Sequence, residues 1–324
     1  MKAMKPMIRV AVTALFLGTA VSLSFSTPSL ARQDQASVLD QKVSKLFDAG
    51  KYMTALPLAR QSLAMREKAS APDDEKLGNS LNNLAALEYN LGHYAVAEPL
   101  YKRALAIAEK LAGPDDEGVA RLLNNLGELY RVQERFADAE PMLKRSVAIR
   151  DKNNPDDESI APALSNLGAV YSNLGRYDLA EPLFKRSLAV LEKARGPDDP
   201  ELSVVLSNLS DTYINQKRYD QAEPLLKRSL RLAEKLGPDN ASVAQALNNL
   251  AAVYLYQGRH DDAEPLLKRA VTVFEKSLGP TSPELVESLD NLAALYKDKG
   301  RTAEAASIAK RAAAIRARAT GQKI

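Results

Sequence analysis

The sequence predicts an all-α fold, a solenoid of about seven helical hairpins, because three unrelated markers recur in phase along most of the chain. An Asn-Leu step, an Ala-Glu-Pro tripeptide and a loop proline each return after 41 or 42 residues. Markers of different chemistry that keep one period indicate a structural unit copied in tandem. Such arrays usually present a surface rather than enclose an active site, so the repeat argues against most enzyme folds at the outset.

Each unit reads as two amphipathic helices joined by a tight turn. In one copy an apolar stripe with steps of three and four residues runs from Ile160 to Leu174, and a second runs from Tyr177 to Leu191. Gly175-Arg176 separates the two stripes, and Gly196-Pro197-Asp198 ends the unit, as expected of turn residues between helices. The predicted hairpins span residues 36–70, 74–112, 116–153, 157–195, 199–236, 240–278 and 282–320, which leaves 321–324 as a tail.

Each hairpin after the first begins with a residue that suits a helix N-cap. The six positions in phase are Asp74, Asp116, Asp157, Asp199, Asn240 and Ser282. Their side-chain oxygens can accept the free N–H groups of a first turn, and no copy has the ligand spacing of a calcium loop. The glutamate of each Ala-Glu-Pro stands four residues before a lysine, as Glu98 does before Lys102, which predicts i,i+4 pairs on a solvated outer face.

Residues 1–31 have the composition of a secretory signal. Three basic residues precede an uncharged, mostly apolar run at 10–25, and Ser29-Leu30-Ala31 supplies a small-x-small cleavage pattern. The run is shorter than the roughly 20 residues that span a bilayer. We therefore expect cleavage after Ala31, a periplasmic or secreted protein and no transmembrane segment in the mature chain; the alternative is an uncleaved membrane anchor.

Composition and charge argue against several other functions. The chain has no cysteine, which excludes disulfides and thiolate chemistry. It has 44 Lys plus Arg and 41 Asp plus Glu, and since residues 1–31 hold three basic residues and no acidic one, the mature chain has 41 of each. A neutral chain gives no reason to expect nucleic acid as a partner. The two histidines, His93 and His260, stand in turns of different repeats and are interpreted as ordinary turn residues, so we predict no metal, no cofactor and no catalysis.

The residues of the unit resemble a known family. Leu126-Gly127, Tyr130, Ala139 and Ser146 match the Leu-Gly, Tyr, Ala, Ala signature of the tetratricopeptide repeat (TPR), a helix–turn–helix unit of about 34 residues. The longer form at 248–254, Asn-Asn-Leu-Ala-Ala-Val-Tyr, is similar to the repeats of kinesin light chain and their bacterial relatives. The resemblance implies a right-handed superhelical solenoid whose first helices line a concave wall.

The asparagines of the Asn-Leu steps are the main candidate binding residues. These six residues, called the ladder below, are Asn83, Asn125, Asn166, Asn208, Asn249 and Asn291. Each costs about 0.5–0.7 kcal/mol relative to Ala inside a helix, so their recurrence needs a cause. The resemblance implies that the amides bind a peptide backbone in the concave groove, since an amide both donates and accepts. The alternative is that each amide bonds the backbone of the neighbouring repeat and sets the stacking.

Residues beside the ladder differ between copies and are expected to select the partner. Those singled out are Asn124, Asn248, Glu128, Arg131 and Asp211. The phased tyrosines Tyr130, Tyr171, Tyr213, Tyr254 and Tyr296 are expected to pack between helices rather than to bind a ligand. The sequence thus predicts a non-catalytic protein–protein interaction module that binds an extended peptide or partner protein in its concave groove. The alternative is a structural scaffold or self-associating envelope protein that uses its outer face or its ends.

Overall fold

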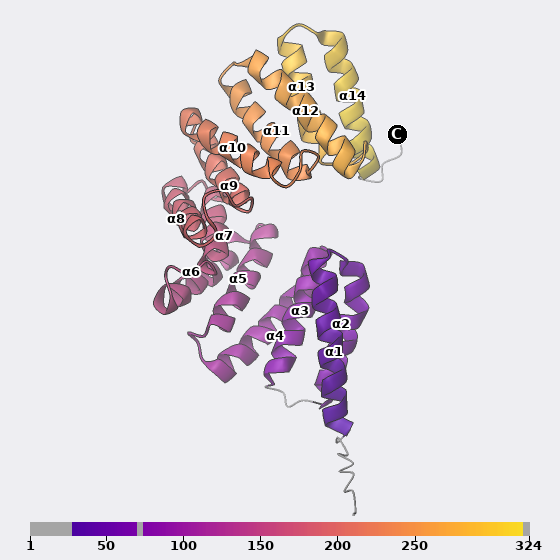
Figure 1. Ribbon diagram of the computed structural model, residues 1–324, viewed down its shortest axis with the longest axis vertical. Helices are drawn as coiled ribbons and strands as arrows, with labels where there is room; N and C mark the ends of the chain where they lie inside the picture. The colour runs from indigo at the N-terminus through magenta and orange to yellow at the C-terminus, as the bar shows by residue number, and fades with distance from the viewer. Residues whose placement is uncertain (1–27, 70–73, 320–324) are drawn as a thin grey trace, which may run out of the picture.

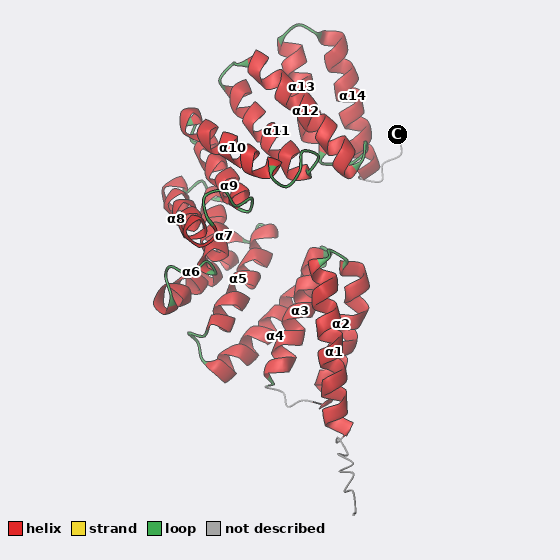
Figure 2. Cartoon of the chain, viewed as in Figure 1, coloured by secondary structure: helices red, strands yellow, loops and turns green. Residues whose placement is uncertain are grey.

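Helical hairpins make up the whole of the part of the chain that the computed structural model describes, residues 28–69 and 74–319 (Figure 2). The first helices of the hairpins are α1 (Pro28–Asp48), α3 (Glu75–Asn90), α5 (Glu117–Val132), α7 (Ile160–Asn173), α9 (Leu202–Asn215), α11 (Ala241–Tyr256) and α13 (Leu285–Asp298). The second helices are α2 (Tyr52–Ala69), α4 (Tyr94–Ala112), α6 (Phe136–Asn153), α8 (Tyr177–Arg195), α10 (Tyr219–Glu234), α12 (His260–Leu278) and α14 (Thr302–Ala319). The predicted all-α solenoid of about seven hairpins is confirmed. Most of the predicted signal segment and the tail at 321–324 lie outside the described residues.

The hairpins stack in chain order into a curved array (Figure 1). The backbones of neighbouring first helices come close to one another, as those of α5 and α7 do. The backbones of neighbouring second helices within the described residues lie further apart, and these helices meet through long side chains, such as Arg145 of α6 with Glu109 of α4. Helices that stay close together lie on the inside of a curve, and helices that diverge lie on its outside. The first helices therefore form the inner wall of the array.

A continuous hydrophobic core lies between the two layers of helices. The leucine that follows each ladder asparagine is buried, and these leucines belong to one cluster that extends from Val43 to Ala305. Full burial of one such side chain stabilises the fold by about 1.5–3 kcal/mol. The leucine and the asparagine are adjacent in sequence, so anchoring the leucine in the core holds the asparagine beside the inner wall.

Three of the six predicted helix caps are confirmed. The side chain of Asp74 accepts a hydrogen bond from the backbone N–H two residues later at 2.7 Å, and Asp116 and Asn240 do the same at 2.8 and 2.9 Å. Each of these residues is the N-cap of its helix, α3, α5 and α11. Each satisfies one of the backbone donors that a helix start leaves open.

At Asp157, Asp199 and Ser282 the prediction of an α-helix N-cap is wrong, because the helices begin three residues later. A single tighter turn comes first: the N–H of the first helical residue donates to the carbonyl of the predicted cap at 3.1–3.2 Å. The carboxylates of Asp157 and Asp199 cap this turn, accepting from the N–H two residues later at 2.9 and 2.8 Å. The capping chemistry is therefore present in these two copies, but it serves a turn ahead of the helix.

A recurring set of three side chains, a glutamate, a tyrosine and an arginine, joins neighbouring hairpins at five of the six interfaces. An arginine from the turn after the first helix pairs with the glutamate of the preceding hairpin's Ala-Glu-Pro and lies 3.9–4.7 Å from the ring centre of a tyrosine on the first helix. We call each such set a joint. The five joints are Glu98–Tyr130–Arg135, Glu140–Tyr171–Arg176, Glu181–Tyr213–Arg218, Glu223–Tyr254–Arg259 and Glu264–Tyr296–Arg301.

The joints confirm one sequence prediction and correct another. The five tyrosines are buried, as expected of packing residues, and four of them also donate their hydroxyl to the glutamate at 3.0–3.3 Å. The expected i,i+4 Glu–Lys pairs are present. Their glutamates, however, do not belong to a solvated face, because they are only 15–21% exposed and bridge two hairpins.

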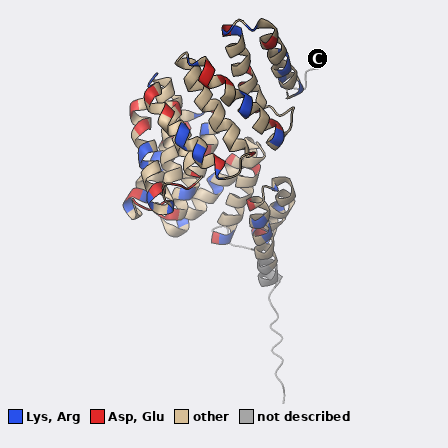
Figure 3. Ribbon diagram, turned by 45° about the horizontal axis from the view of Figure 1, so that its top comes forward, with Lys and Arg blue, Asp and Glu red and all other residues tan. Residues whose placement is uncertain are grey.

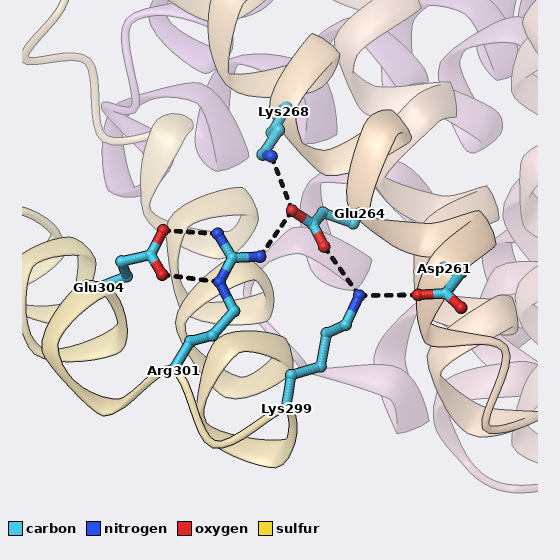
Figure 4. A network of polar contacts seen from close by, with 6 residues as sticks. All are labelled: Asp261, Glu264, Lys268, Lys299, Arg301 and Glu304. Atoms are coloured by element: carbon cyan, nitrogen blue, oxygen red, sulfur yellow. Dashed lines mark hydrogen bonds and ion pairs between the residues drawn. The ribbon is translucent and has the colours of Figure 1, made fainter.

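In the last joint, one glutamate accepts hydrogen bonds from three basic side chains (Figure 4). Glu264 accepts from Lys268 at 2.7 Å, from Arg301 at 2.9 Å and from Lys299 at 3.0 Å. Arg301 also binds Glu304, and Lys299 also binds Asp261. The hydrogen bond from Lys268, together with those from Arg301 and Lys299, lowers the pKa of Glu264 to about 2.

The first interface also pairs a carboxylate with two basic side chains, but its carboxylate comes from the first helix of the later hairpin. Glu88 takes the place of the tyrosine and Leu56 takes the place of the glutamate. The buried Glu88 carboxylate accepts from Arg60 at 2.7 Å and contacts Nδ1 of His93 at 2.7 Å. Burial raises the pKa of Glu88, but the hydrogen bonds and charges of Arg60 and His93 outweigh it, so the pKa lies below its ordinary value. His93 is therefore an interface residue and not an ordinary turn residue.

Candidate functional site

The ladder asparagines all lie on first helices, and all are partly buried. Three of them bond a side chain of the preceding hairpin. The Nδ2 of Asn125 donates to Oδ1 of Asn82 at 3.1 Å, and the Nδ2 of Asn166 donates to Oδ1 of Asn124 at 3.1 Å. Asn291 donates in the same way to Asn248 at 3.3 Å. The acceptor is a side-chain amide, so the expectation of a bond to the neighbouring backbone is wrong.

The residue just before the preceding ladder position decides whether this bond forms. It is an asparagine in the three bonded cases. Before Asn208 and Asn249 it is a serine, Ser165 or Ser207, and each serine bonds a serine of its own second helix. Before Asn83 it is Asp40, whose carboxylate bonds Ser62 and Arg66.

The remaining three ladder amides therefore have no partner in the preceding hairpin. Asn249 accepts from Gln245 of its own helix at 2.9 Å. The side chains of Asn83 and Asn208 make no hydrogen bond to any described part of the chain. Both carry an open donor and an open acceptor on the inner wall.

Asn83 lines a pocket of about 420 Å³ in the inner wall, between α1, α3 and α5. Val43, Phe47, Tyr89 and Tyr101 form its apolar part. Its polar part is made of Asn82, Asn83, Asn124, Asn125 and Glu128. A pocket of this size with a few convergent polar groups is typical of a ligand site.

Asn208 lines the second pocket, of about 350 Å³, between α5, α7 and α9. Arg131 and Asp211 supply its charges, Ser172 and Asn215 are among its polar residues, and Ile214 is among its apolar ones. Each of the two amides without a partner thus lines one of the two pockets.

The two carboxylates predicted to select a partner differ in their surroundings. Glu128 holds Arg131 through two hydrogen bonds, at 2.7 and 2.8 Å, and accepts from the Tyr89 hydroxyl at 3.0 Å. Asp211 is exposed and makes no hydrogen bond or ion pair within the described ranges. Although its side chain is exposed to the groove, the surrounding helices exclude part of the water around Asp211, and this desolvation, with the charge of Glu287, raises the pKa of Asp211 to about 6.

The two pockets bring together seven of the eleven predicted site residues. The first holds Asn83, Asn124, Asn125 and Glu128, and the second holds Arg131, Asn208 and Asp211. Asn166, Asn248, Asn249 and Asn291 line neither pocket. Asn248 is fully buried and accepts from Asn291, so its place is structural and the prediction that it selects a partner is corrected.

The family model of the tetratricopeptide repeat matches residues 34–110, 77–152, 159–235 and 242–318. The chain belongs to the tetratricopeptide repeat family. No curated protein matches it.

Solved structures share the TPR fold at low sequence identity. BtubC (BKLC) from P. vanneervenii is 22% identical, with a TM-score of 0.57 over 77% of this chain and 93% of that one. A putative kinesin light chain with nearly identical TPR-like repeats from Podospora anserina is 19% identical, with a TM-score of 0.53 over 64% and 98%. The Rap conjugation gene regulator of plasmid pLS20, in complex with the Phr* peptide, is 15% identical, with a TM-score of 0.63 over 92% and 78%. At these identities the likeness shows the fold alone.

The inner wall of the TPR array includes residues that the sequence did not single out. Val43 and Phe47 of α1 line the first pocket, although the first hairpin lacks the Asn-Leu step. The spacing from Tyr52 to Tyr94, which begin successive second helices, would have placed α1 in phase and brought these residues opposite α3.

Charges on the TPR array are mixed in sign. Acidic and basic residues are interspersed on the helices in the view of Figure 3. Within residues 28–69 and 74–319, no three His, Asp or Glu side chains converge as metal ligands would. No helix in the same ranges is long and apolar enough to cross a membrane.

Proposed function

We propose that this TPR array is a non-catalytic interaction module whose inner wall binds an extended peptide, or an extended segment of a partner protein. One observation carries the proposal: both ladder amides that have no hydrogen-bond partner within the described residues, Asn83 and Asn208, line pockets of the inner wall. An amide that closes a structural contact is not available to a ligand, whereas Asn83 and Asn208 are.

Backbone recognition is the chemistry that these two amides suit. A side-chain amide can accept from a peptide N–H and donate to a peptide C=O at once, whatever side chains the peptide carries. A neutral hydrogen bond contributes about 0.5–1.5 kcal/mol net, so contacts at two places yield moderate affinity. The joints hold neighbouring hairpins in one geometry, and this reduces the entropy lost when a ligand binds.

The first pocket adds room for an apolar side chain of the ligand. Phe47, Val43 and Tyr101 form an apolar surface next to the amides of Asn83 and Asn125. A ligand strand could therefore place a side chain against the apolar part while its backbone reaches the amides. The peptide complex of the pLS20 Rap regulator, whose fold is similar, supports an array of this kind as a peptide receptor.

Peptide selection followed by matched substitutions tests this proposal. Peptides would be selected by phage display on residues 32–324, and their affinities measured by fluorescence anisotropy. We expect Asn83→Ala with Asn208→Ala to lose about 2 kcal/mol, or roughly 30-fold in affinity, if each amide contributes about two weak hydrogen bonds.

Asn166→Ala is the control, because this amide is bonded to Asn124 and lines neither pocket. The Asn166→Ala variant should bind the selected peptides with an affinity within about twofold of that of the unchanged protein. If the double variant remains helical by circular dichroism and binds the selected peptides as well as the control does, the groove is not the binding site.

We also propose that the protein acts outside the cytoplasm, after removal of residues 1–31. The basic start, the apolar run and Ser29-Leu30-Ala31 support this. Intact-mass measurement of the protein purified from a cell-envelope fraction tests it. A chain that begins at Arg32 is expected, and a full-length chain found only in the cytosol would contradict the proposal.

A further inference from the structure

Asp211 is a charged group on the inner wall that nothing in the described structure neutralises. It lines the second pocket with Asn208 and Ser172, and it forms neither an ion pair nor a hydrogen bond within residues 28–69 and 74–319. The glutamates of the joints are each held by an arginine and a lysine of the array. The joints therefore neutralise their own glutamates, whereas Asp211 on the inner wall has no counter-ion within the described residues.

The same position two hairpins earlier shows what Asp211 lacks. Glu128 on α5 has Arg131 three residues later, and the two form a bidentate pair at 2.7 and 2.8 Å. On α9 the residue three after Asp211 is Ile214. Arg131 also lines the second pocket, but its guanidinium is held by Glu128. The array thus supplies a cation to the carboxylate of α5 and none to that of α9.

The surroundings of Asp211 disfavour a bare negative charge. Its pKa is raised to about 6 because the helices around it exclude part of the water and because Glu287 on α13 adds a second negative charge. A cation placed against Asp211 would relieve both effects, whereas an anion would meet the same unfavourable potential. The pocket therefore prefers a positively charged group.

We infer that the second pocket is a subsite for a basic side chain, in which the cationic group of a ligand lysine or arginine pairs with Asp211. This inference rests on the proposed function and adds the class of partner, an extended peptide with a basic residue at one position.

The remaining lining residues suit such a side chain. The amide oxygens of Asn208 and Asn215 and the hydroxyl of Ser172 can accept from an ammonium or guanidinium group. Ile214 and Ala169 offer apolar contact to the aliphatic stem, since lysine and arginine bury their methylenes while the charge stays among polar groups. A volume of about 350 Å³ leaves room for one long side chain.

Three peptide pools test the inference without a known ligand. Each pool contains acetylated and amidated nonapeptides of random uncharged residues, and the pools differ only in the central residue, which is Arg, Glu or Leu. Binding to residues 32–324 is measured by competition against a fluorescent selected peptide. We expect the Arg pool to bind at least tenfold more tightly than the Leu pool, which corresponds to about 1.4 kcal/mol, and the Glu pool to bind more weakly than either.

Two substitutions separate charge from shape. Asp211→Asn keeps the volume, removes the charge and should make the Arg and Leu pools equal. Ile214→Arg keeps the carboxylate but supplies a cation at the spacing of Glu128 and Arg131, so it should abolish the preference as well. Ile214→Leu is the matched control and should retain it. Circular dichroism establishes that each variant is folded.

The outcomes distinguish this inference from the proposed function. An Arg pool that binds no better than the Leu pool, or a preference that survives Asp211→Asn, overturns the basic subsite. If in that case the Leu pool still binds and loses affinity in the Asn83→Ala/Asn208→Ala variant, the groove remains a peptide site. If no pool binds, the groove function fails and the subsite fails with it.

Discussion

Removing the hydroxyl of Tyr213 tests whether the joints hold the array together. In Tyr213→Phe the buried ring stays, and only the hydrogen bond from the hydroxyl to Glu181, of 3.0 Å, is lost. Burial opposes ionisation of Glu181, yet hydrogen bonds from Arg218, Lys185 and Tyr213 lower its pKa to about 2. The lost bond is therefore one to a charged acceptor.

The expected loss of stability follows from that geometry. A hydrogen bond to a charged group contributes about 1.5–3 kcal/mol. Glu181 keeps Arg218 and Lys185, both at 2.7 Å, and it is 19% exposed, so water can replace part of the lost bond. We expect a decrease of about 1–2 kcal/mol in the free energy of unfolding, which for a chain of this size lowers the melting temperature by roughly 2–5 °C.

Thermal and urea melts followed by circular dichroism measure the effect. The control is Tyr219→Phe, because the Tyr219 hydroxyl makes no hydrogen bond within the described residues and its ring stacks on Tyr256 at 5.6 Å. This variant should melt with the unchanged protein. If both variants have the same stability, the hydroxyl–carboxylate bond does not stabilise the joint and the reasoning is refuted.

Three other predictions concern the ladder asparagines, the helix N-caps and the dependence of stability on pH. Asn291→Ala should destabilise by about 1 kcal/mol, because it leaves the buried amide of Asn248 without its partner, whereas Asn83→Ala should be neutral or stabilising by up to about 0.6 kcal/mol; equal urea midpoints would contradict this. Asp116→Ala should cost about 1 kcal/mol through the lost N-cap, while Asp115→Ala, which removes only an exposed pair with Lys152, should leave the melting curve unchanged. The carboxyls of Glu98, Glu181 and Glu264 have pKa values of about 2 in the folded chain, below their ordinary value of 4.5. The stability that they add is therefore complete above about pH 5 and is lost as the pH falls toward 2. A variant with all three changed to Gln should show a weaker dependence of the free energy of unfolding on pH between about 5 and 2, and an unchanged dependence would exclude these groups as its cause.

The fold could be predicted from the sequence because the same pattern recurs in several copies. Each turn and each buried leucine occupies the same position in several repeats, so a position that is ambiguous in one copy is settled by the others. The errors at Asp157, Asp199 and Ser282 lie at helix starts, where a short turn and an α-helix use the same capping side chain and differ only in which carbonyl accepts.

The sequence predicted only some of the contacts that the glutamates of the joints make. The spacing of Glu98 and Lys102 predicts a contact within one helix, and that contact exists. The contacts of Glu98 with Tyr130 and Arg135 join residues 32 and 37 positions apart, so no pattern within one helix predicts them. The glutamate, tyrosine and arginine recur in phase in the four copies from 116 to 278, but phase alone does not tell which faces of the helices meet.

The two uses of the ladder could not be separated without the structure. Six identical amides in phase suggest one role, yet the side chain before the ladder in the preceding hairpin decides between two. Asn124 and Ser165 occupy that position in successive hairpins, and one bonds the next ladder residue while the other turns to its own second helix. The pockets likewise depend on which helices converge, and α1 contributes to one of them from the least regular copy.

The recurrence of one joint bears on how such a chain can change its length. Each of the five joints needs a tyrosine and an arginine from the later hairpin and a glutamate from the earlier one. A hairpin duplicated or deleted by recombination between two copies of the repeat would therefore meet compatible neighbours on both sides. The interface at Glu88, with Arg60 and His93, uses a different set of side chains, so a hairpin carrying Tyr and Arg in place of α3 and α4 would leave Arg60 without its carboxylate. Duplication or deletion of a hairpin thus preserves the contacts at the five joints, whereas the first hairpin and the one after it match each other through a different set of side chains.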